Sequence, residues 1–274
     1  MFCFQCQEAA NGVGCKVKGV CGKEDQVAAL QDLLIFVTKG VAYWADKGRL
    51  KNKAVDVETG RFITTALFTT ITNANFDEQA IIGRIREGLK VRDGIQSRVL
   101  SGCGCSGSTA LPECATWASD DEMKIRAKAV EVGVLTTSNE DVRSLRELVM
   151  YGLKGVAAYA NHASDLKYED LVIYDHCVTA LAGTIKDLSI DELVALTMKT
   201  GEMAVKTLAL LDTANTTAYG APEITQVNLG VRKNPGILVS GHDLRDLEDL
   251  MEQRHGEEGG IVPSLAVGTK VLQP

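Results

Sequence analysis

The sequence of 274 residues has few aromatic side chains, no long apolar run and no excess of basic residues. Phe, Trp and Tyr together make up 5% of the chain, so alanine, leucine, valine and glycine must fill most of its core. No stretch reaches about 18 apolar residues in a row, which argues against a membrane span. A net charge of −7 and an isoelectric point near 5.2 argue against a nucleic-acid-binding surface.

A secretory signal is also missing from the start of the sequence. Residues 1–22 have no basic start, no apolar run of about seven residues and no cleavage-like site. We therefore expect a cytoplasmic protein whose thiols are kept reduced. Hydrophobic residues at 45% and charged residues at 24% are ordinary for a soluble globular chain, and the length allows one large domain or two modest ones.

Cysteine is present eight times, and half of these residues fall within the first 21 positions. They are Cys3, Cys6, Cys15 and Cys21, in the pattern C-x2-C-x8-C-x5-C. Two cysteines separated by two residues can direct both sulfurs to one ion or one cluster face, because the backbone between them turns tightly. The longer gaps bring two more sulfurs from the other side. Four thiolates suit either a structural zinc site or an iron–sulfur cluster.

Three interpretations of this cysteine loop compete. Disulfides are disfavoured by the cytoplasmic setting, and a four-cysteine zinc site usually shows two C-x2-C pairs where this chain has one. The iron–sulfur interpretation is favoured by glycines that let the backbone wrap closely around sulfur and by lysines that would offset the negative charge of a thiolate cluster. These residues are Gly12, Gly14, Gly19, Gly22, Lys16, Lys18 and Lys23.

Apolar residues at helical spacing predict a three-helix bundle over residues 24–99. The first helix, 27–50, follows the acidic residues Glu24 and Asp25, which favour a helix start. Its apolar face consists of Leu30, Leu33, Leu34, Val37 and Val41. Further helices are expected over 57–72 and 77–99, separated by a polar break at residues 73–75.

A second three-helix bundle is expected over residues 121–219, beginning with a short helix at 121–133. A long helix follows the cap residue Asn139, with one apolar face formed by Val142, Val149, Leu153, Val156 and Ala160, and with Gly152 and Gly155 placed for close helix approach. Another helix covers 168–185. The last begins at the capping box formed by Ser189 and Glu192, and Val194, Met198, Gly201, Val205 and Leu208 share the face that we expect to pack in the bundle.

Other cysteines and histidines in the helical region carry weaker signals. The break at 101–120 holds Cys103, Cys105 and Cys114, but C-x-C-x8-C is not a common ligand pattern, so we interpret them as free loop thiols rather than a second metal site. His162 and His176 have no second ligand at helical spacing, so packed or surface positions are favoured over metal binding.

The pattern changes near residue 222, where prolines and glycines mark a boundary. Residues 237–239 are apolar and read as a buried parallel strand, followed by a turn at Gly241 and a helix from Asp243. His242 therefore stands at the carboxyl end of a strand, the edge at which open α/β folds bind ligands. By position alone, it fits an ordinary turn residue equally well.

The sequence resembles the hybrid cluster proteins, also called hydroxylamine reductases or prismanes. The cysteine spacing matches the short form of that family, which accompanies a [4Fe–4S] cluster, and residues 234–244, NPGILVSGHDL, resemble the segment that holds the histidine ligand of its hybrid Fe–S–O cluster. Further matches to the helical domain of the family are residues 139–148, 151–155, 211–215 and 219–220. The resemblance covers about residues 1–253.

The resemblance implies a mainly α fold with an N-terminal Fe–S loop and two three-helix bundles over 1–222, followed by the start of a Rossmann-like α/β domain over 223–274. It implies that Cys3, Cys6, Cys15 and Cys21 hold the [4Fe–4S] cluster and that His242 ligates the hybrid cluster. Glu257 stands in a shortened His-Gly-Glu segment and is kept as a candidate ligand, with a solvated carboxylate at the helix end as the alternative. No cysteine follows Cys177, so most hybrid-cluster ligands of the family have no counterpart in this chain.

The implied function is the reduction of hydroxylamine to ammonia and water, with nitric oxide reduction as a related activity. The implied partners are a small nitrogenous substrate and a redox protein, with a homodimer as a further option and no nucleic acid or membrane. The missing cysteines leave a second interpretation, a non-catalytic [4Fe–4S] electron-transfer or interaction module. A zinc-stabilised helical protein is the third.

Overall fold

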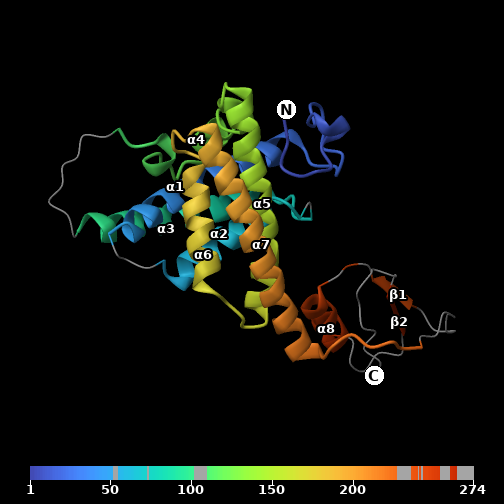
Figure 1. The fold of residues 1–274 in the computed structure, drawn as a ribbon. Helices are drawn as coiled ribbons and strands as arrows, with labels where there is room; N and C mark the ends of the chain where they lie inside the picture. Colours follow the sequence, from blue (N-terminus) through green and yellow to red (C-terminus); the bar gives the residue numbers. More distant parts are fainter. Residues whose placement is uncertain are drawn as a thin grey trace. The chain divides into compact units, whose positions relative to one another are not determined.

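The computed structural model describes residues 1–51, 55–72, 74–101, 110–226, 236–239, 241, 243–253 and 260–263, and it is mainly helical (Figure 1). The elements are α1 (Asp25–Arg49), α2 (Val57–Thr69), α3 (Glu78–Leu100), α4 (Glu122–Ala129), α5 (Glu140–Asp165), α6 (Leu171–Gly183), α7 (Ile190–Tyr219), β1 (Gly236–Val239), α8 (Leu244–Gln253) and β2 (Gly260–Pro263). Short 3₁₀ turns cover Ala10–Gly12, Glu113–Ala115 and Val134–Thr136. The mainly α class predicted from the sequence is confirmed.

Contacts divide the chain into two compact units. The first, here called the helical unit, comprises Met1–Asn161 and Asp170–Leu208. The second comprises His162–Glu169 and Ala209–Pro274. The domains 1–222 and 223–274 stay a prediction.

Short polar side chains define several helix starts in the helical unit. The predicted capping box of α7 is confirmed, because the backbone N–H of Ser189 donates to Glu192 Oε2 at 2.8 Å and the N–H of Glu192 donates to Ser189 Oγ at 3.3 Å. The predicted cap of α5 is confirmed by the bond from the Val142 N–H to Asn139 Oδ1 at 3.0 Å.

Helix α1 forms the centre of the helical unit and packs against α2, α3 and α6. Its predicted apolar face is confirmed, since Leu30, Leu33, Leu34, Val37 and Val41 are each at most 1% exposed. Among the described residues, α1 is the one helix long and apolar enough to cross a membrane, but 72% of that window is buried inside the protein. Burial of this kind is what a core helix requires.

Helices from both predicted bundles share one core. Helix α6, expected in the second bundle, packs against α1 and α2. A side chain at Gly60 of α2 would overlap the Tyr174 ring of α6, so the missing Cβ sets how closely these helices approach.

Helices α5 and α7 match the sequence pattern in part. The predicted face of α5 is buried at Val149, Leu153 and Val156, and a Cβ at Gly152 would lie 2.7 Å from Thr200 Cγ2 of α7, so that close approach is confirmed. The same expectation for Gly155 is wrong, since no atom of the described residues lies within 4 Å of the Cβ position.

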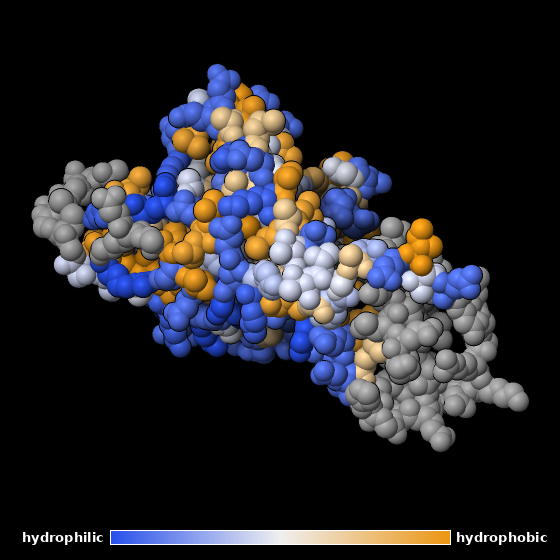
Figure 2. All heavy atoms as spheres, turned by 60° about the horizontal axis from the view of Figure 1, so that its bottom comes forward, coloured by the Kyte–Doolittle hydropathy of each residue, from blue (hydrophilic) through white to orange (hydrophobic). Residues whose placement is uncertain are grey.

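The face of α7 that was expected to pack is instead exposed. Val194, Met198, Val205 and Leu208 are 44%, 72%, 69% and 47% exposed, and the face opposite them is buried. Buried residues of that opposite face include Leu193, Thr200, Met203, Thr207 and Ala214. Small or apolar residues lie on two faces of α7. The helical spacing of apolar residues therefore does not identify which face packs against the other helices. Hydrophobic residues also reach the surface among hydrophilic ones on the face drawn in Figure 2.

The second unit contains one β–α–β segment. Strand β1 coincides with the predicted strand and pairs in parallel with β2, with Ile237 opposite Ile261. Helix α8 begins at the predicted position. Strand β2 was not expected from the sequence. One pair of strands does not establish a larger sheet, so the predicted start of a Rossmann-like domain is not confirmed.

Candidate metal centre in the N-terminal loop

The loop before α1 places two of the four predicted cysteine ligands side by side. Cys3 and Cys15 form an antiparallel bridge in which the N–H of Cys3 donates to Cys15 O at 3.0 Å and the N–H of Cys15 donates to Cys3 O at 2.9 Å. Gly14 allows the turn that returns the chain to Cys3, because its φ is +132° and a Cβ would lie 2.7 Å from the Phe2 ring.

The four thiols differ in exposure, and they are not yet gathered around one point. Cys3, Cys6 and Cys15 are 6%, 9% and 5% exposed, whereas Cys21 is exposed. Within the described part of the chain, no three Cys, His, Asp or Glu side chains come together as a metal site. The structure thus brings Cys3 and Cys15 side by side, and it does not gather the four thiols around one point.

The surroundings of the thiols nevertheless fit an iron–sulfur cluster in donor chemistry. The Ala10 N–H donates to Cys15 Sγ at 3.5 Å, the kind of bond that stabilises a sulfur ligand. Burial raises the pKa of the Cys3 thiol, while a hydrogen bond from the Gln5 backbone and the charge of Lys23 lower it. Bonding to iron would replace the proton that burial favours.

The other predicted site residues are placed only in part. His242, Glu257, Cys103 and Cys105 lie outside the described residues. Cys114 is buried and forms no disulfide, and the interpretation of this segment as free loop thiols stays a prediction.

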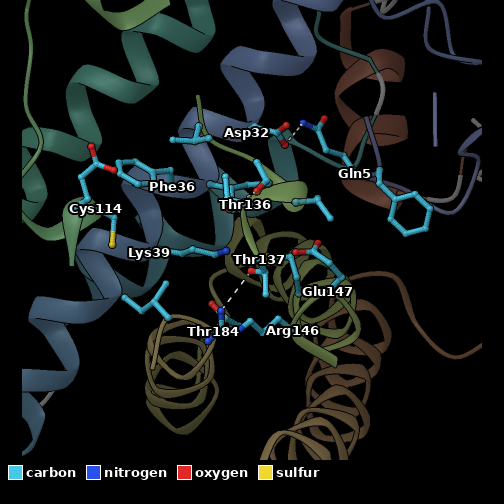
Figure 3. A pocket seen from close by; sticks show the side chains of 18 of the residues that line it. Gln5, Asp32, Phe36, Lys39, Cys114, Thr136, Thr137, Arg146, Glu147 and Thr184 are labelled. Atoms are coloured by element: carbon cyan, nitrogen blue, oxygen red, sulfur yellow. Dashed lines mark hydrogen bonds between the residues drawn. The ribbon is translucent and has the colours of Figure 1, made fainter. Parts of the chain in front are cut away.

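A buried polar network beneath the cysteine loop was missed by the sequence analysis. Gln5, between Cys3 and Cys6, is 2% exposed, and its Nε2 donates to Asp32 Oδ1 at 2.7 Å (Figure 3) and to Ala28 O at 2.9 Å. Its side-chain oxygen accepts from Lys23 Nζ at 2.7 Å and its backbone oxygen accepts from Lys154 Nζ at 2.8 Å. The network fastens the loop to α1 and α5.

The remaining members of this network lie on the two helices. Lys23 Nζ also donates to Gln31 Oε1, and Gln31 Nε2 is buried without a hydrogen-bond partner among the described residues. The Tyr151 hydroxyl of α5 donates to Phe4 O at 2.7 Å, one turn before Lys154. The sequence offered one signal of this buried network: two polar residues, Gln31 and Asp32, stand directly between the core residues Leu30 and Leu33.

A cavity of about 340 Å³ adjoins the loop at Phe4 and Gln5. Figure 3 shows Lys39, Arg146, Glu147 and Asp32 around it, from α1 and α5. Its wall includes Lys154, so the cavity borders the polar network.

The two described histidines have different surroundings. In the helical unit, His176 is 8% exposed and its Nε2 lies 3.1 Å from Thr200 Oγ1, and burial lowers its pKa to about 4. In the second unit, His162 Nδ1 lies 3.5 Å from Asp243 Oδ2, the residue after His242, and this contact raises the pKa of His162.

Comparison with known proteins gives a consistent result over nearly the whole chain. The sequence pattern of the Prismane/CO dehydrogenase family matches residues 1–262. A hydroxylamine reductase of Desulfosudis oleivorans is 56% identical over 260 residues, which cover 93% of this chain and 46% of that protein. Hydroxylamine reductase of Halothermothrix orenii is 56% identical over 262 residues, covering 94% and 47%.

A third relative, hydroxylamine reductase 2 of Clostridium acetobutylicum, is 50% identical over 275 residues, covering 93% of this chain and 48% of that protein. The chain therefore spans about half the length of the curated relatives it matches.

Proposed function

The chain belongs to the Prismane/CO dehydrogenase family, and from this membership we propose that its N-terminal loop carries an iron–sulfur cluster of a hydroxylamine reductase-like oxidoreductase. The observation that supports the proposal most directly is the cysteine loop itself. Four thiols lie within 21 residues, three of them are buried, and a backbone N–H donates to Cys15 Sγ. Four-thiolate loops of this density bind iron–sulfur clusters or zinc.

In this proposal Cys3, Cys6, Cys15 and Cys21 are the ligands of a [4Fe–4S] cluster, which supplies one-electron transfer when bound. The protein holds Cys3 and Cys15 through their backbone bridge, and the glycines at positions 12, 14 and 22, all with positive φ, let the rest of the loop wrap around the cluster. Buried thiols and a nearby buried lysine limit access of water to the sulfurs.

The wider reaction is the reduction of hydroxylamine to ammonia and water, which consumes two electrons and two protons, with nitric oxide reduction as a related activity. His242 is proposed as a ligand of the hybrid Fe–S–O cluster and Glu257 as a further candidate ligand. An imidazole ligand suits an iron that binds and releases small nitrogen compounds. The proposed partners are a cytoplasmic redox protein and a small nitrogenous substrate.

A second candidate function is a non-catalytic electron-transfer or interaction module. It requires only the four thiols of the N-terminal loop, all of which lie among the described residues. Turnover separates the two functions: steady reduction of hydroxylamine by the anaerobically purified chain, well above the rate of free cluster, would contradict the module.

The cluster itself is tested by measuring iron, acid-labile sulfide and zinc per chain after purification without oxygen. We expect about four irons and four sulfides. Cys6→Ser should lose both together, while the control Cys177→Ser, at a fully buried thiol of α6 outside the loop, should keep them. More than four irons would indicate a second site, and one zinc without iron would contradict the redox function.

A further inference from the structure

Two lysine side chains are buried beneath the cysteine loop. Lys23 and Lys154 are each 1% exposed, although lysine is almost never fully buried unless its charge is paired. Lys23 lies two residues before the start of α1, and Lys154 lies in α5, more than a hundred residues later in the sequence. Both ammonium groups donate to Gln5, which lies between two of the proposed ligands.

The hydrogen-bond partners of these ammonium groups are neutral. Lys23 donates to the amide oxygens of Gln5 and Gln31, and Lys154 donates to the backbone oxygen of Gln5. Within the described residues, neither forms an ion pair with a carboxylate. A buried charge without a counter-ion costs several kcal/mol, on the order of what a small domain can spare.

Two carboxylates, Asp32 and Glu147, attract the Lys154 ammonium group through space, but among the described residues neither forms an ion pair or a hydrogen bond with it. Asp32 accepts a hydrogen bond from Gln5, and burial raises its pKa to about 6, so its carboxylate stays mostly ionised at neutral pH but is bonded to Gln5 and not to either lysine. Glu147 lies two turns before Lys154 on α5, lines the cavity, and is partly exposed to solvent. Donors also exceed acceptors, because Gln31 Nε2 is buried without a partner among the described residues.

We propose that Lys154, together with Lys23, supplies the countercharge for the thiolate cluster and thereby sets its reduction potential. Neither lysine is a ligand of the cluster; each acts on it through its positive charge. The inference rests on the proposed function. A reduced cluster carries one more negative charge than an oxidised one. A fixed cation in a poorly solvated site therefore stabilises the reduced form more, and the potential rises. The added reductant gives one electron to the cluster, and no bond or proton moves.

The test is a redox titration of the anaerobically purified chain, followed by the electron paramagnetic resonance signal of the reduced cluster. Lys154→Met removes the charge with little change in side-chain length. We expect its midpoint potential to become more negative, with at least about a tenfold lower ratio of reduced to oxidised cluster at the wild-type midpoint, which is about 59 mV for one electron. The matched control is Lys199→Met, on α7 outside the loop, whose side chain is 51% exposed and paired with Glu202 at 2.6 Å. It should leave the potential unchanged.

Two further variants give a signature that a purely structural role would not produce. Lys154→Arg keeps the charge and should hold the potential close to wild type. Glu147→Gln removes a negative charge on the same helix from a partly exposed position, so it should move the potential in the opposite direction, upward. Opposite shifts for opposite charges support the proposal.

Each outcome decides a different question. Four irons in every variant with equal midpoint potentials would overturn the inference and leave the cluster in place. If Lys154→Met does not retain iron, Glu147→Gln decides: an upward shift supports the role of charge, and no shift overturns it. A wild-type chain without iron would instead reject the proposed function itself.

Discussion

At the scale of single residues, the reactivity of each cysteine depends on how deeply its thiol is buried. Burial raises the pKa of Cys114 to about 11 and that of Cys177 to about 12, whereas Cys21 is exposed. Only the thiolate reacts with alkylating agents. We expect iodoacetamide at about neutral pH to label Cys21 of the cluster-free chain before the buried thiols of the described residues and to leave Cys114 and Cys177 unlabelled.

Peptide mass spectrometry at several labelling times measures this order. In denaturant, all cysteines should react at similar rates, which controls for differences between peptides. Rapid labelling of Cys177 in the native chain would contradict the packing of α6 described above.

The residues of the candidate site divide into those that a sequence can reveal and those that it cannot. The four loop cysteines lie within 21 residues, so their local spacing carries the prediction of a metal or cluster site. The contact between Lys154 and Gln5 joins residues 149 positions apart, and no local pattern specifies such a pairing. Lys154 occupies an ordinary position in an amphipathic helix until the fold places it under the loop.

At the scale of the element, glycine positions control how closely helices and segments approach. A Cβ at Gly40 of α1 would overlap the carbonyl of Cys114, while a Cβ at Gly83 of α3 would meet no atom of the described residues within 4 Å. Gly40→Ala should lower the free energy of unfolding by about 1 to 3 kcal/mol through overpacking against backbone. Its control, Gly83→Ala, should raise it by about 0.5 to 1 kcal/mol, because alanine favours the helix.

Denaturant midpoints of the two variants measure this difference. Equal stability of both alanine variants would mean that the segment at Cys114 moves away from α1 without cost. That result would contradict the anchoring of this segment by two hydrogen bonds. Trp44 Nε1 donates to Ala115 O at 3.0 Å, and Arg92 Nη1 donates to Cys114 O at 3.2 Å.

The spacing of apolar residues predicts the buried face of some helices and leaves that of others ambiguous. The apolar face of α1 was predicted correctly because it is the single continuous face of aliphatic residues on that helix. In α7, the buried face mixes Leu193 and Met203 with the smaller Thr200, Thr207 and Ala214, while Val194, Met198, Val205 and Leu208 lie on the exposed face. Hydrophobicity alone selects the wrong face in such a helix, since small residues also allow close packing.

At the scale of the whole molecule, His176 links stability to pH. Burial, followed by the charge of Lys199, lowers its pKa from 6.5 to about 4, while Glu202 acts in the opposite direction. Below pH 6.5 the unfolded chain binds a proton that the folded chain does not. Stability therefore falls as pH decreases from 6.5 to about 4 and then levels off, by up to about 3 kcal/mol.

We expect His176→Gln to reduce this acid-dependent loss, because glutamine has no proton to gain and can still bond to Thr200. Thermal midpoints of both proteins between pH 7 and 4 measure the effect, with the difference between them cancelling other groups such as Asp32. Parallel curves for the two proteins would show that the pKa of His176 is the same in the folded and unfolded chain, which would contradict the effect of burial.

The fold of the whole chain was predictable as far as local patterns and short connections extend. The helices and the mainly α class follow from periodicity and caps. The packing of α6 against α1 and α2 does not, because it joins segments that lie far apart in sequence. Strand β2 was missed since Gly260–Pro263 is short and its parallel partner lies across a helix.

The position of α6 also has a consequence for protein synthesis. Helix α1, at the centre of the helical unit, leaves the ribosome about 130 residues before the end of α6. At about 5 to 20 residues per second, part of its apolar face waits about 7 to 26 s for its last partner. During that time the nascent chain exposes part of the apolar face of α1, which α6 later covers.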